Sequence, residues 1–358
     1  MNLLSKTKHS ISEIESLRLD SLRLPLILMV VYIHSYGGAL LFHETSMGGS
    51  IYEYISHLLS QEVFRVAVPL FYMISGYLLF YQNDIKPVSY CRVLLKKTRT
   101  LVVPYLFFNL LILTVYAVAQ NILDLYTLFE NSKLISKYYM YDYFNAVLGF
   151  SGYPISYHFW FVRNLFLLFL IYPFLTIMLL SKWRGIFCWL AFILWLTSAI
   201  PSMVIEPLFF FYLGGYLYFN YRTIFEFDRH MVLLFFIFSF FSLFFPIFDN
   251  FGLLLSTKFT IISGVFFTLA ITSKISKFSK AQHWLIKLSP ASFFVFCLHE
   301  PLLSFSKKVL ILLFSPSEVG VFIIIYLFLP LVIVSILTFS YFFCQVKFNF
   351  FMRLVFGR

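Results

Sequence analysis

The chain alternates long apolar stretches with short polar connections. A helix needs about 20 mostly apolar residues to cross a bilayer. Ten stretches approach or reach that length, and they cover residues 22–42, 63–82, 101–120, 158–181, 185–201, 205–220, 231–248, 252–273, 290–313 and 319–345. The fifth and sixth are short, so their limits stay open. The pattern predicts an all-α integral membrane protein, a bundle of about ten transmembrane helices.

Lys and Arg residues concentrate in every second connection. With the N-terminus placed inside, most of the 27 Lys and Arg residues fall in inside segments. Lys133, Lys137, Lys258, Lys307 and Lys308 fall outside or near the outer ends of spans, and the remaining Arg65 and Arg163 fall within spans. The positive-inside rule therefore places both termini in the cytoplasm. We expect a retained N-terminal tail at 1–21, a transmembrane domain at 22–345 and a C-terminal tail at 346–358.

Composition supports a bilayer environment and argues against nucleic acid as a partner. The chain is 61% hydrophobic and only 12% charged, whereas soluble domains average about 45–50% apolar and about 25% charged residues. The net charge of +11 is divided among short clusters, and nucleic-acid binding needs a contiguous basic face. The four cysteines form neither a CxxC pair nor a disulfide framework.

Two arginines fall within predicted spans. An Arg at the centre of a span costs about 2.5–3.5 kcal/mol, so such residues usually face a cavity or a partner. Arg65 lies near the outer end of its span, where snorkelling and a functional role are equally open. Arg163 lies deeper, in a span that is almost wholly apolar from Leu165 onward. A cavity-facing role is favoured there over snorkelling.

The first span carries a histidine, His34, eleven residues after Arg23. Eleven steps of 100° bring both side chains to one helix face, with an axial separation of about 16 Å. The face would then carry a cation at the cytoplasmic rim and an imidazole deep inside. A long substrate with a phosphorylated head and a reactive tail matches that spacing.

Other polar residues have open interpretations. His299, beside Glu300, lies well inside the ninth span, where a histidine satisfied by a neighbouring helix is as plausible as a functional one. His158 begins the fourth span as either an interfacial or a functional residue. No HExxH or comparable spacing exists, so we expect no metal. Gly214 and Gly215 indicate close helix packing and not phosphate binding.

The residues now described resemble membrane-bound acyltransferase family 3, the integral O-acyltransferases of bacterial surface sugars. The Arg-x10-His spacing of Arg23 and His34 is the most specific mark. Further matching stretches follow in the family's order, namely "RLDSLRLPLILMVVYIH", "FRVAVPLFYMISGYLL" with Ser75 of its SGY element, "KKTRTLVVPYL", "YHFWFVRNLFLLFLIYPFL" with His158 and Trp160, "FFFYLGGYLY" and "SPASFFVFCLHEPLL".

The resemblance implies that acyl-CoA binds from the cytoplasm and that an acyl group, often acetyl, reaches a sugar hydroxyl outside. It implies a catalytic role for His34 and a functional role for Arg65. Many members carry a second Arg three residues away, but here those positions are Glu62 and Val68. Roles assigned to an arginine pair therefore do not transfer. Some members also carry a C-terminal SGNH-type soluble domain, which we do not expect in this chain.

We predict an O-acyltransferase of the bacterial inner membrane with acyl-CoA, most simply acetyl-CoA, as co-substrate and no permanently bound cofactor. The acceptor would be an O-antigen, capsule or exopolysaccharide unit. His34 would serve as base or as covalent acyl relay, two routes that the sequence does not separate. Arg23, with Asp20, would bind the donor, and Arg65 or Arg163 would stabilise the oxyanion or hold the acceptor. Ser75, His158, Trp160, His299 and Glu300 are further site candidates.

A transporter or flippase for a lipid-linked sugar or organic acid is the alternative. Intramembrane ionisable residues also mark transport pathways. A pathway, however, needs no base aligned with a cytoplasmic cation. A structural subunit of an envelope assembly fits less well, since it predicts no charges within the spans.

Overall fold

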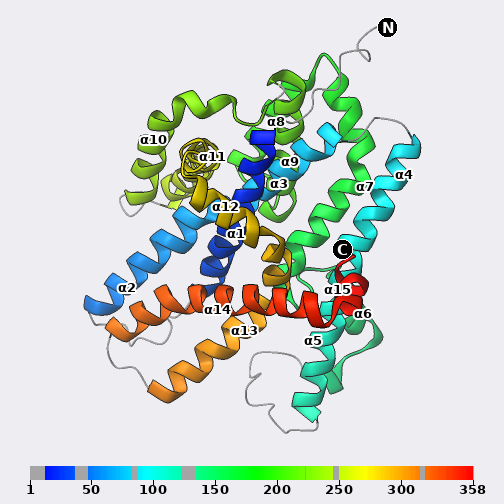
Figure 1. Cartoon of the computed structure of the whole chain (residues 1–358), viewed down its shortest axis with the longest axis vertical. Coiled ribbons are helices and arrows are strands. Elements are labelled where there is room, and N and C mark those ends of the chain that lie inside the picture. Colours follow the sequence, from blue (N-terminus) through cyan, green and yellow to red (C-terminus); the bar gives the residue numbers. More distant parts are fainter. Residues whose placement is uncertain are drawn as a thin grey trace. The chain divides into compact units, whose positions relative to one another are not determined.

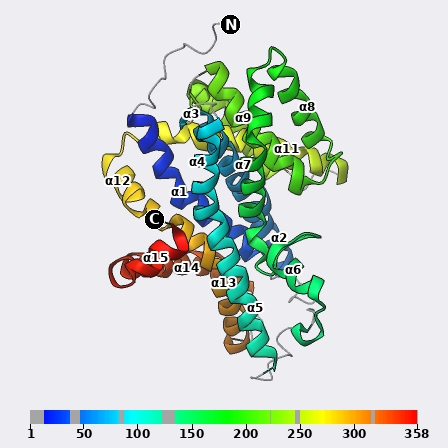
Figure 2. The same ribbon diagram turned by 90° about the vertical axis from the view of Figure 1, so that its right-hand side faces the viewer.

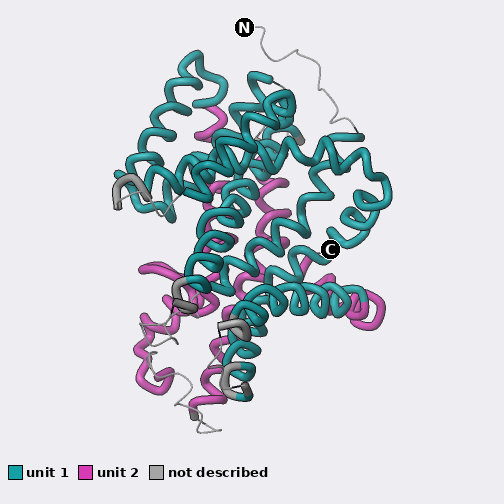
Figure 3. The backbone as a smooth tube through the Cα atoms, turned by 90° about the vertical axis from the view of Figure 1, so that its left-hand side faces the viewer, with its two compact units in different colours: residues 1–82, 178–342 teal, residues 83–177, 343–358 magenta. Residues whose placement is uncertain are grey.

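The computed structural model describes residues 13–36, 47–82, 87–121, 134–221, 223–244, 250–314 and 319–357, and every regular element in these ranges is a helix. The chain divides into two compact units (Figure 3). Unit 1 comprises residues 1–82 and 178–342, and unit 2 comprises residues 83–177 and 343–358.

Seven helical segments in the described ranges are long and apolar enough to cross a membrane. They are Ile51–Tyr81, Tyr90–Gln120, Tyr157–Leu180, Ser202–Tyr221, Leu254–Ile275, Ser279–Leu310 and Ile323–Lys347. Each overlaps one predicted span, which confirms an all-α membrane protein. The number ten is not reproduced.

The three remaining predicted spans correspond to helices that are too short or too polar to be counted among these seven. Helix α1 (Glu13–Ser35) carries several charged residues at its start, and α8 (Arg184–Leu196) and α10 (Met231–Leu243) have 13 residues each. The ends of two of these predicted spans, residues 37–42 and 245–248, lie outside the described residues, as does the predicted tail up to residue 12.

Unit 1 contains α1 and the segments that surround it (Figure 1). Its other elements are α2 (Met47–His57), the π-helical turn η2 (Leu58–Val63), η3 (Phe64–Val66), α3 (Ala67–Gln82), α8, α9 (Ser202–Tyr221), η8 (Glu226–His230), α10, α11 (Asn250–Ile275), α12 (Ser279–Leu288), η10 (Ser289–Ala291), α13 (Ser292–Phe314) and α14 (Val319–Lys347), whose last residues belong to unit 2.

Unit 2 contains a long rod made of α4, η4 and α5 (Figure 1). Its elements are α4 (Pro87–Lys97), η4 (Thr98–Val102), α5 (Val103–Asn121), η6 (Ile135–Lys137), α6 (Met140–Leu148), η7 (Tyr157–Phe159), α7 (Trp160–Leu180), whose last residues belong to unit 1, and α15 (Asn349–Phe356). Tyr105 of α5 donates a hydrogen bond of 2.9 Å to the carbonyl of Leu148, which joins α5 to the end of α6.

Helix α1 is enclosed by protein. It packs against α3, α11, α12 and α13, and α12 runs beside it (Figure 2). Leu26 and Val31 are completely buried, and Ile27 and Val30 are nearly so. A helix that is apolar around most of its circumference must be covered either by protein or by lipid, and the burial of these residues shows that protein covers them here. The segment that carries Arg23 and His34 therefore lies inside unit 1 for most of its length.

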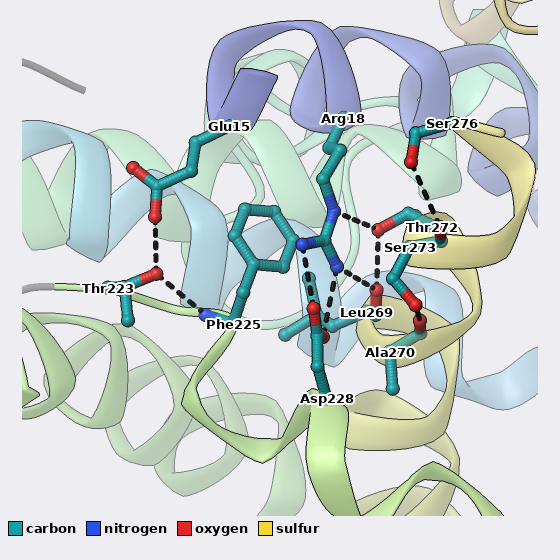
Figure 4. Close-up of polar contacts among 10 residues, drawn as sticks. All are labelled: Glu15, Arg18, Thr223, Phe225, Asp228, Leu269, Ala270, Thr272, Ser273 and Ser276. Carbon is teal, nitrogen blue, oxygen red and sulfur yellow. Dashed lines mark hydrogen bonds and ion pairs between the residues drawn. The ribbon is translucent and has the colours of Figure 1, made fainter. Parts of the chain in front are cut away.

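The start of α1 is fixed by the buried guanidinium of Arg18 (Figure 4). It forms a bidentate ion pair with the Asp228 carboxylate, with N–O distances of 2.7 and 2.9 Å. It also donates to the hydroxyl of Thr272 at 2.8 Å and lies 3.6 Å from the centre of the Phe225 ring. Paired hydrogen bonds of this kind fix orientation as well as distance. They fasten α1 to η8 and α11.

Helices α3 and α9 meet at two glycines. A Cβ atom at Gly76 would overlap the carbonyl oxygen of Phe211, and one at Gly214 would overlap that of Met73. Small residues allow membrane helices to approach this closely. The expectation that Gly214 and Gly215 serve helix packing is confirmed.

Candidate functional site

The imidazole of His34 on α1 faces the imidazole of His299 on α13. Their ring centroids are 5.2 Å apart. His299 is completely buried, so the pair is directed into unit 1. The Nδ1 atom of His299 lies 2.7 Å from the carbonyl oxygen of Phe296. Since a carbonyl oxygen only accepts, the Nδ1 atom of His299 carries the proton of this hydrogen bond.

Lys307, further along α13, also connects α13 to α1. Its ammonium donates to the carbonyl oxygens of His34 and Ser35, at 3.1 and 3.4 Å. The last carbonyls of a helix have no partner within the helix, and a cation at this end is favourable. Lys307 therefore fixes the backbone that carries His34. The sequence analysis counted Lys307 only as an outer charge, although it lies about two turns beyond His299 on the same helix.

Glu300 lies between these groups in the sequence. Its carboxylate accepts a hydrogen bond of 2.6 Å from the hydroxyl of Ser304, and it is an electrostatic neighbour of Lys307. The His299–Glu300 pair suggested by the sequence thus has two different environments. His299 faces His34, and Glu300 faces the polar residues further along α13.

Arg23 and His34 lie on one uninterrupted helix, as the eleven-residue spacing requires. Arg23 forms an ion pair of 2.9 Å with Asp20, and their side chains are 44% and 33% exposed. Exposed pairs of this kind contribute about 0–1 kcal/mol, so Arg23 can exchange its partner at little cost. Ile27 and Val30, which lie between Arg23 and His34 on this face, are buried. Protein, not lipid, covers the face that joins the two residues.

Arg65 lies on the wall of a cavity of about 360 Å³ in unit 1. Its guanidinium donates to the side chain of Gln61 at 3.0 Å and is otherwise exposed. The same wall contains Glu62, which the sequence analysis noted only as the missing second arginine. Glu62 is completely buried and accepts a hydrogen bond of 2.9 Å from Thr257. A carboxylate bordering an apolar run was the signal that could have identified it.

Arg163 belongs to unit 2. Its guanidinium donates to the carbonyl oxygens of Gly149 and Gly152, the latter at 2.6 Å. Gly149 ends α6 with φ of 65°, a conformation that favours glycine, and a Cβ atom there would lie 2.7 Å from the Arg163 guanidinium. The Arg163 guanidinium thus contacts the turn that follows α6, and its cavity-facing role stays a prediction.

The remaining candidates occupy both units. In unit 2, His158 is almost completely buried, and Trp160 begins α7 half-buried. In unit 1, Ser75 is half-buried beside Gly76 at the α3–α9 contact. Among the described residues, no group of three His, Cys, Asp or Glu side chains could hold a metal ion.

In the part of the chain that the structure describes, seven apolar helical segments, together with the contact of His34 with the buried His299 beside the Lys307 ammonium, indicate a multi-pass membrane protein with a polar interior site. Residues 16–344 match the sequence model of acyltransferase family 3, described as an acyltransferase domain. The chain therefore belongs to acyltransferase family 3, and it is a membrane O-acyltransferase. No curated protein and no solved structure matches it.

Proposed function

We propose that the protein transfers an acyl group, most simply acetyl, from acyl-CoA on the cytoplasmic side to a hydroxyl of a surface carbohydrate on the outer side. The observation that carries this proposal is the contact of the half-buried His34 with the buried His299, on a helix, α1, that presents an exposed arginine about three turns before His34. O-antigen, capsule or exopolysaccharide units are the acceptor classes, and the bacterial inner membrane is the location.

The topology that this reaction requires has both termini in the cytoplasm. In addition to the seven apolar segments, α1, α8 and α10 cross the bilayer, and residues 1–21 and 346–358 are the tails. Arg23 then lies at the inner rim and His34 about 16 Å away along the helix axis. The distribution of Lys and Arg supports this orientation.

Arg23 binds a phosphate of CoA. A guanidinium offers a planar set of donors that matches phosphate, and its present partner Asp20 holds it in place until the phosphate arrives. The pantetheine arm extends along α1 toward His34. Acyl-CoA is a co-substrate here, and no cofactor is bound permanently.

His34 supplies the proton transfer. In direct transfer, its imidazole takes the proton of the sugar hydroxyl while the oxygen attacks the thioester carbonyl. The C–S bond then breaks, and the proton passes from His34 to the CoA sulfur. A positioned base contributes roughly 10²–10⁴-fold to the rate. His299 and Lys307 are positioning residues that hold the ring and the backbone of His34.

A covalent relay uses the same residue. His34 attacks the thioester, CoA leaves as the thiol, and acyl-His34 passes the acyl group to the sugar oxygen with return of the imidazole. Arg65 serves the acceptor side, because it lines the cavity near the predicted outer end of its helix. Arg163 serves as a positioning residue for the turn at residues 149–152.

The decisive experiment reconstitutes the purified protein in liposomes with acetyl-CoA labelled in the acetyl group. We expect label in de-O-acetylated surface polysaccharide supplied as acceptor, and none with His34→Ala. Label trapped on the protein without acceptor supports the relay. Transport of an unmodified lipid-linked sugar, with no transfer of label under any condition, would contradict the proposal and support a flippase.

A further inference from the structure

The cavity beside Arg65 is built by elements that are distant in sequence. Its wall combines the end of α2, η2, η3, the connection from α8 to α9, the start of α9, and α11. A volume of about 360 Å³ lies at the lower end of the range for small-molecule sites, about 300–1,000 Å³. Segment η2 is π-helical, a rare form that is frequently found at functional sites.

Two carboxylates and two cations line this cavity. Glu62 is completely buried, and while Thr257 bonds its Oε1, no hydrogen-bond partner reaches its Oε2 among the described residues. Burying a carboxylate oxygen without a partner is costly. Thr260, which is also completely buried, is a second hydroxyl neighbour of this carboxylate, and the remaining acceptor capacity of Glu62 is open to a donor bound in the cavity.

The second carboxylate, Glu206, is held in place. It accepts a hydrogen bond of 3.1 Å from the indole of Trp195 and is an electrostatic neighbour of Lys258. Lys258 is 6% exposed, and its ammonium lies 4.5 Å from the centre of the Trp195 ring. Ser198, also on the wall, has a φ of 51°, an uncommon conformation for a residue other than glycine. Such strain clusters at ligand sites.

The lining offers donors and acceptors in nearly equal measure. Carboxylate oxygens of Glu62 and Glu206 accept, the cations of Arg65 and Lys258 donate, and the hydroxyls of Ser198 and Ser202 do both. The formal charges cancel, so neither a strongly anionic nor a strongly cationic ligand is favoured. A sugar ring carries several hydroxyls, each of which donates and accepts at once.

We infer that this cavity is the acceptor site, in which a sugar hydroxyl donates a hydrogen bond to Oε2 of Glu62. The inference rests on the proposed function and names the place where its carbohydrate binds. In this arrangement Lys258 and Arg65 donate hydrogen bonds to neighbouring oxygens of the same sugar unit.

The cavity reaches the helix that carries His34. His57 on its wall packs edge-on against Tyr36, with ring centroids 6.1 Å apart, and Tyr36 follows His34 by two residues. Ser60, which lies in the same turn as Glu62, donates a hydrogen bond of 2.6 Å to the carbonyl oxygen of Tyr32. The segment that carries Glu62 therefore packs against the end of α1 at which acyl transfer takes place.

The test compares wild type with Glu62→Gln, which keeps the shape but removes the charge. The probe is a set of oligosaccharides from de-O-acetylated surface polysaccharide of the source cells. Binding is measured by thermal stabilisation of the full chain in nanodiscs. We expect at least a 10-fold rise in Kd, since hydrogen bonds to charged groups are the stronger ones. Glu226→Gln, a half-buried glutamate on η8 outside the cavity, serves as the matched control and should leave the Kd unchanged.

Donor turnover separates this inference from the proposed function. Acetyl-CoA hydrolysis without acceptor should continue in Glu62→Gln within about twofold of wild type.

Unchanged oligosaccharide binding in this variant overturns the inference, as does failure of wild type to bind any oligosaccharide. Loss of hydrolysis with retained oligosaccharide binding also overturns it, because the cavity would then serve the donor. If wild type does not transfer the acetyl label to acceptor, the proposed function fails alone, and the binding comparison still decides the acceptor site. If Glu62→Gln does not fold, Lys258→Met takes its place with the same expected rise.

Discussion

The imidazole rings of His34 and His299 face each other across the contact between α1 and α13, with centroids 5.2 Å apart. Two buried imidazolium ions at this separation would repel each other without water to screen them. At most one of the two rings therefore carries a positive charge, and while both rings are neutral either can accept one proton. A neutral His34 ring can accept the proton that acyl transfer releases. This contact leads to the first two predictions.

Replacement of His34 should abolish acyl transfer without loss of the protein from the membrane. His34→Gln keeps a side chain of similar reach but cannot accept a proton, and we expect a loss of roughly 10²–10⁴-fold. The measurement is the acyl mass on surface glycan, alongside protein abundance in the membrane fraction. His283→Gln, an exposed histidine on α12, is the control. Substantial activity in His34→Gln would remove the catalytic assignment.

Replacement of His299 should reduce turnover by a graded amount. His299→Asn can still donate to the carbonyl of Phe296 but lacks the Nε2 that faces His34, whereas His299→Phe loses both groups. We expect kcat to fall more in the phenylalanine variant, with the KM for acyl-CoA unchanged in both. The pH profile of kcat should also shift in both variants, because the buried titratable ring that lies next to His34 is gone. An unaltered profile would reduce His299 to a packing residue.

Arg23→Ala should raise the KM for acyl-CoA. Loss of a charge-assisted contact with phosphate predicts a rise of roughly 10-fold or more, with a smaller effect on kcat. Asp20→Asn should change KM less, since the Arg23–Asp20 pair is exposed and weak. Arg92→Ala, an exposed arginine on α4, is the control. Steady-state kinetics in liposomes measure all three, and an unchanged KM in Arg23→Ala would exclude the phosphate contact.

Arg18 and Asp228 should be coupled in stability. Arg18→Ala leaves the Asp228 carboxylate without its two-pronged partner, and breaking a buried pair costs about 3–5 kcal/mol. The double variant Arg18→Met with Asp228→Leu should recover much of this loss, because no unpaired charge remains. Unfolding of the detergent-solubilised protein measures the difference. Equal stability of wild type and Arg18→Ala would show that α1 is fastened by other contacts.

Gly76→Ala should weaken the contact between α3 and α9. The new Cβ would overlap the carbonyl oxygen of Phe211, so the helices must separate, and forced overpacking costs about 1–3 kcal/mol. Gly185→Ala is the matched control, since a Cβ there would meet only the Tyr216 hydroxyl at 3.8 Å. A helical Gly→Ala change without a clash is neutral or slightly stabilising. Comparable stability of the two variants would contradict the close approach seen at Gly76.

Much of this protein follows from local sequence patterns. Long apolar stretches predict membrane helices because backbone polar groups in lipid must be satisfied within a helix. The eleven-residue step from Arg23 to His34 gives a shared face because helical geometry is the same in every helix. The Gly214–Gly215 pair predicts close packing because small side chains let backbones approach. The number of spans is harder to predict, since α1, α8 and α10 are short or polar when judged alone.

The partners of the polar residues were decided only by the tertiary structure. The sequence placed His299 and Lys307 on one helix but could not show that both meet the end of α1. It suggested a cavity-facing role for Arg163 but not its contact with the turn after α6. It passed over Glu62, which acquires its role from Thr257 on another helix. Such contacts join residues far apart in the chain, and the rotation and depth of each helix within the bundle set them. These quantities depend on all neighbouring surfaces at once, and no local pattern encodes them.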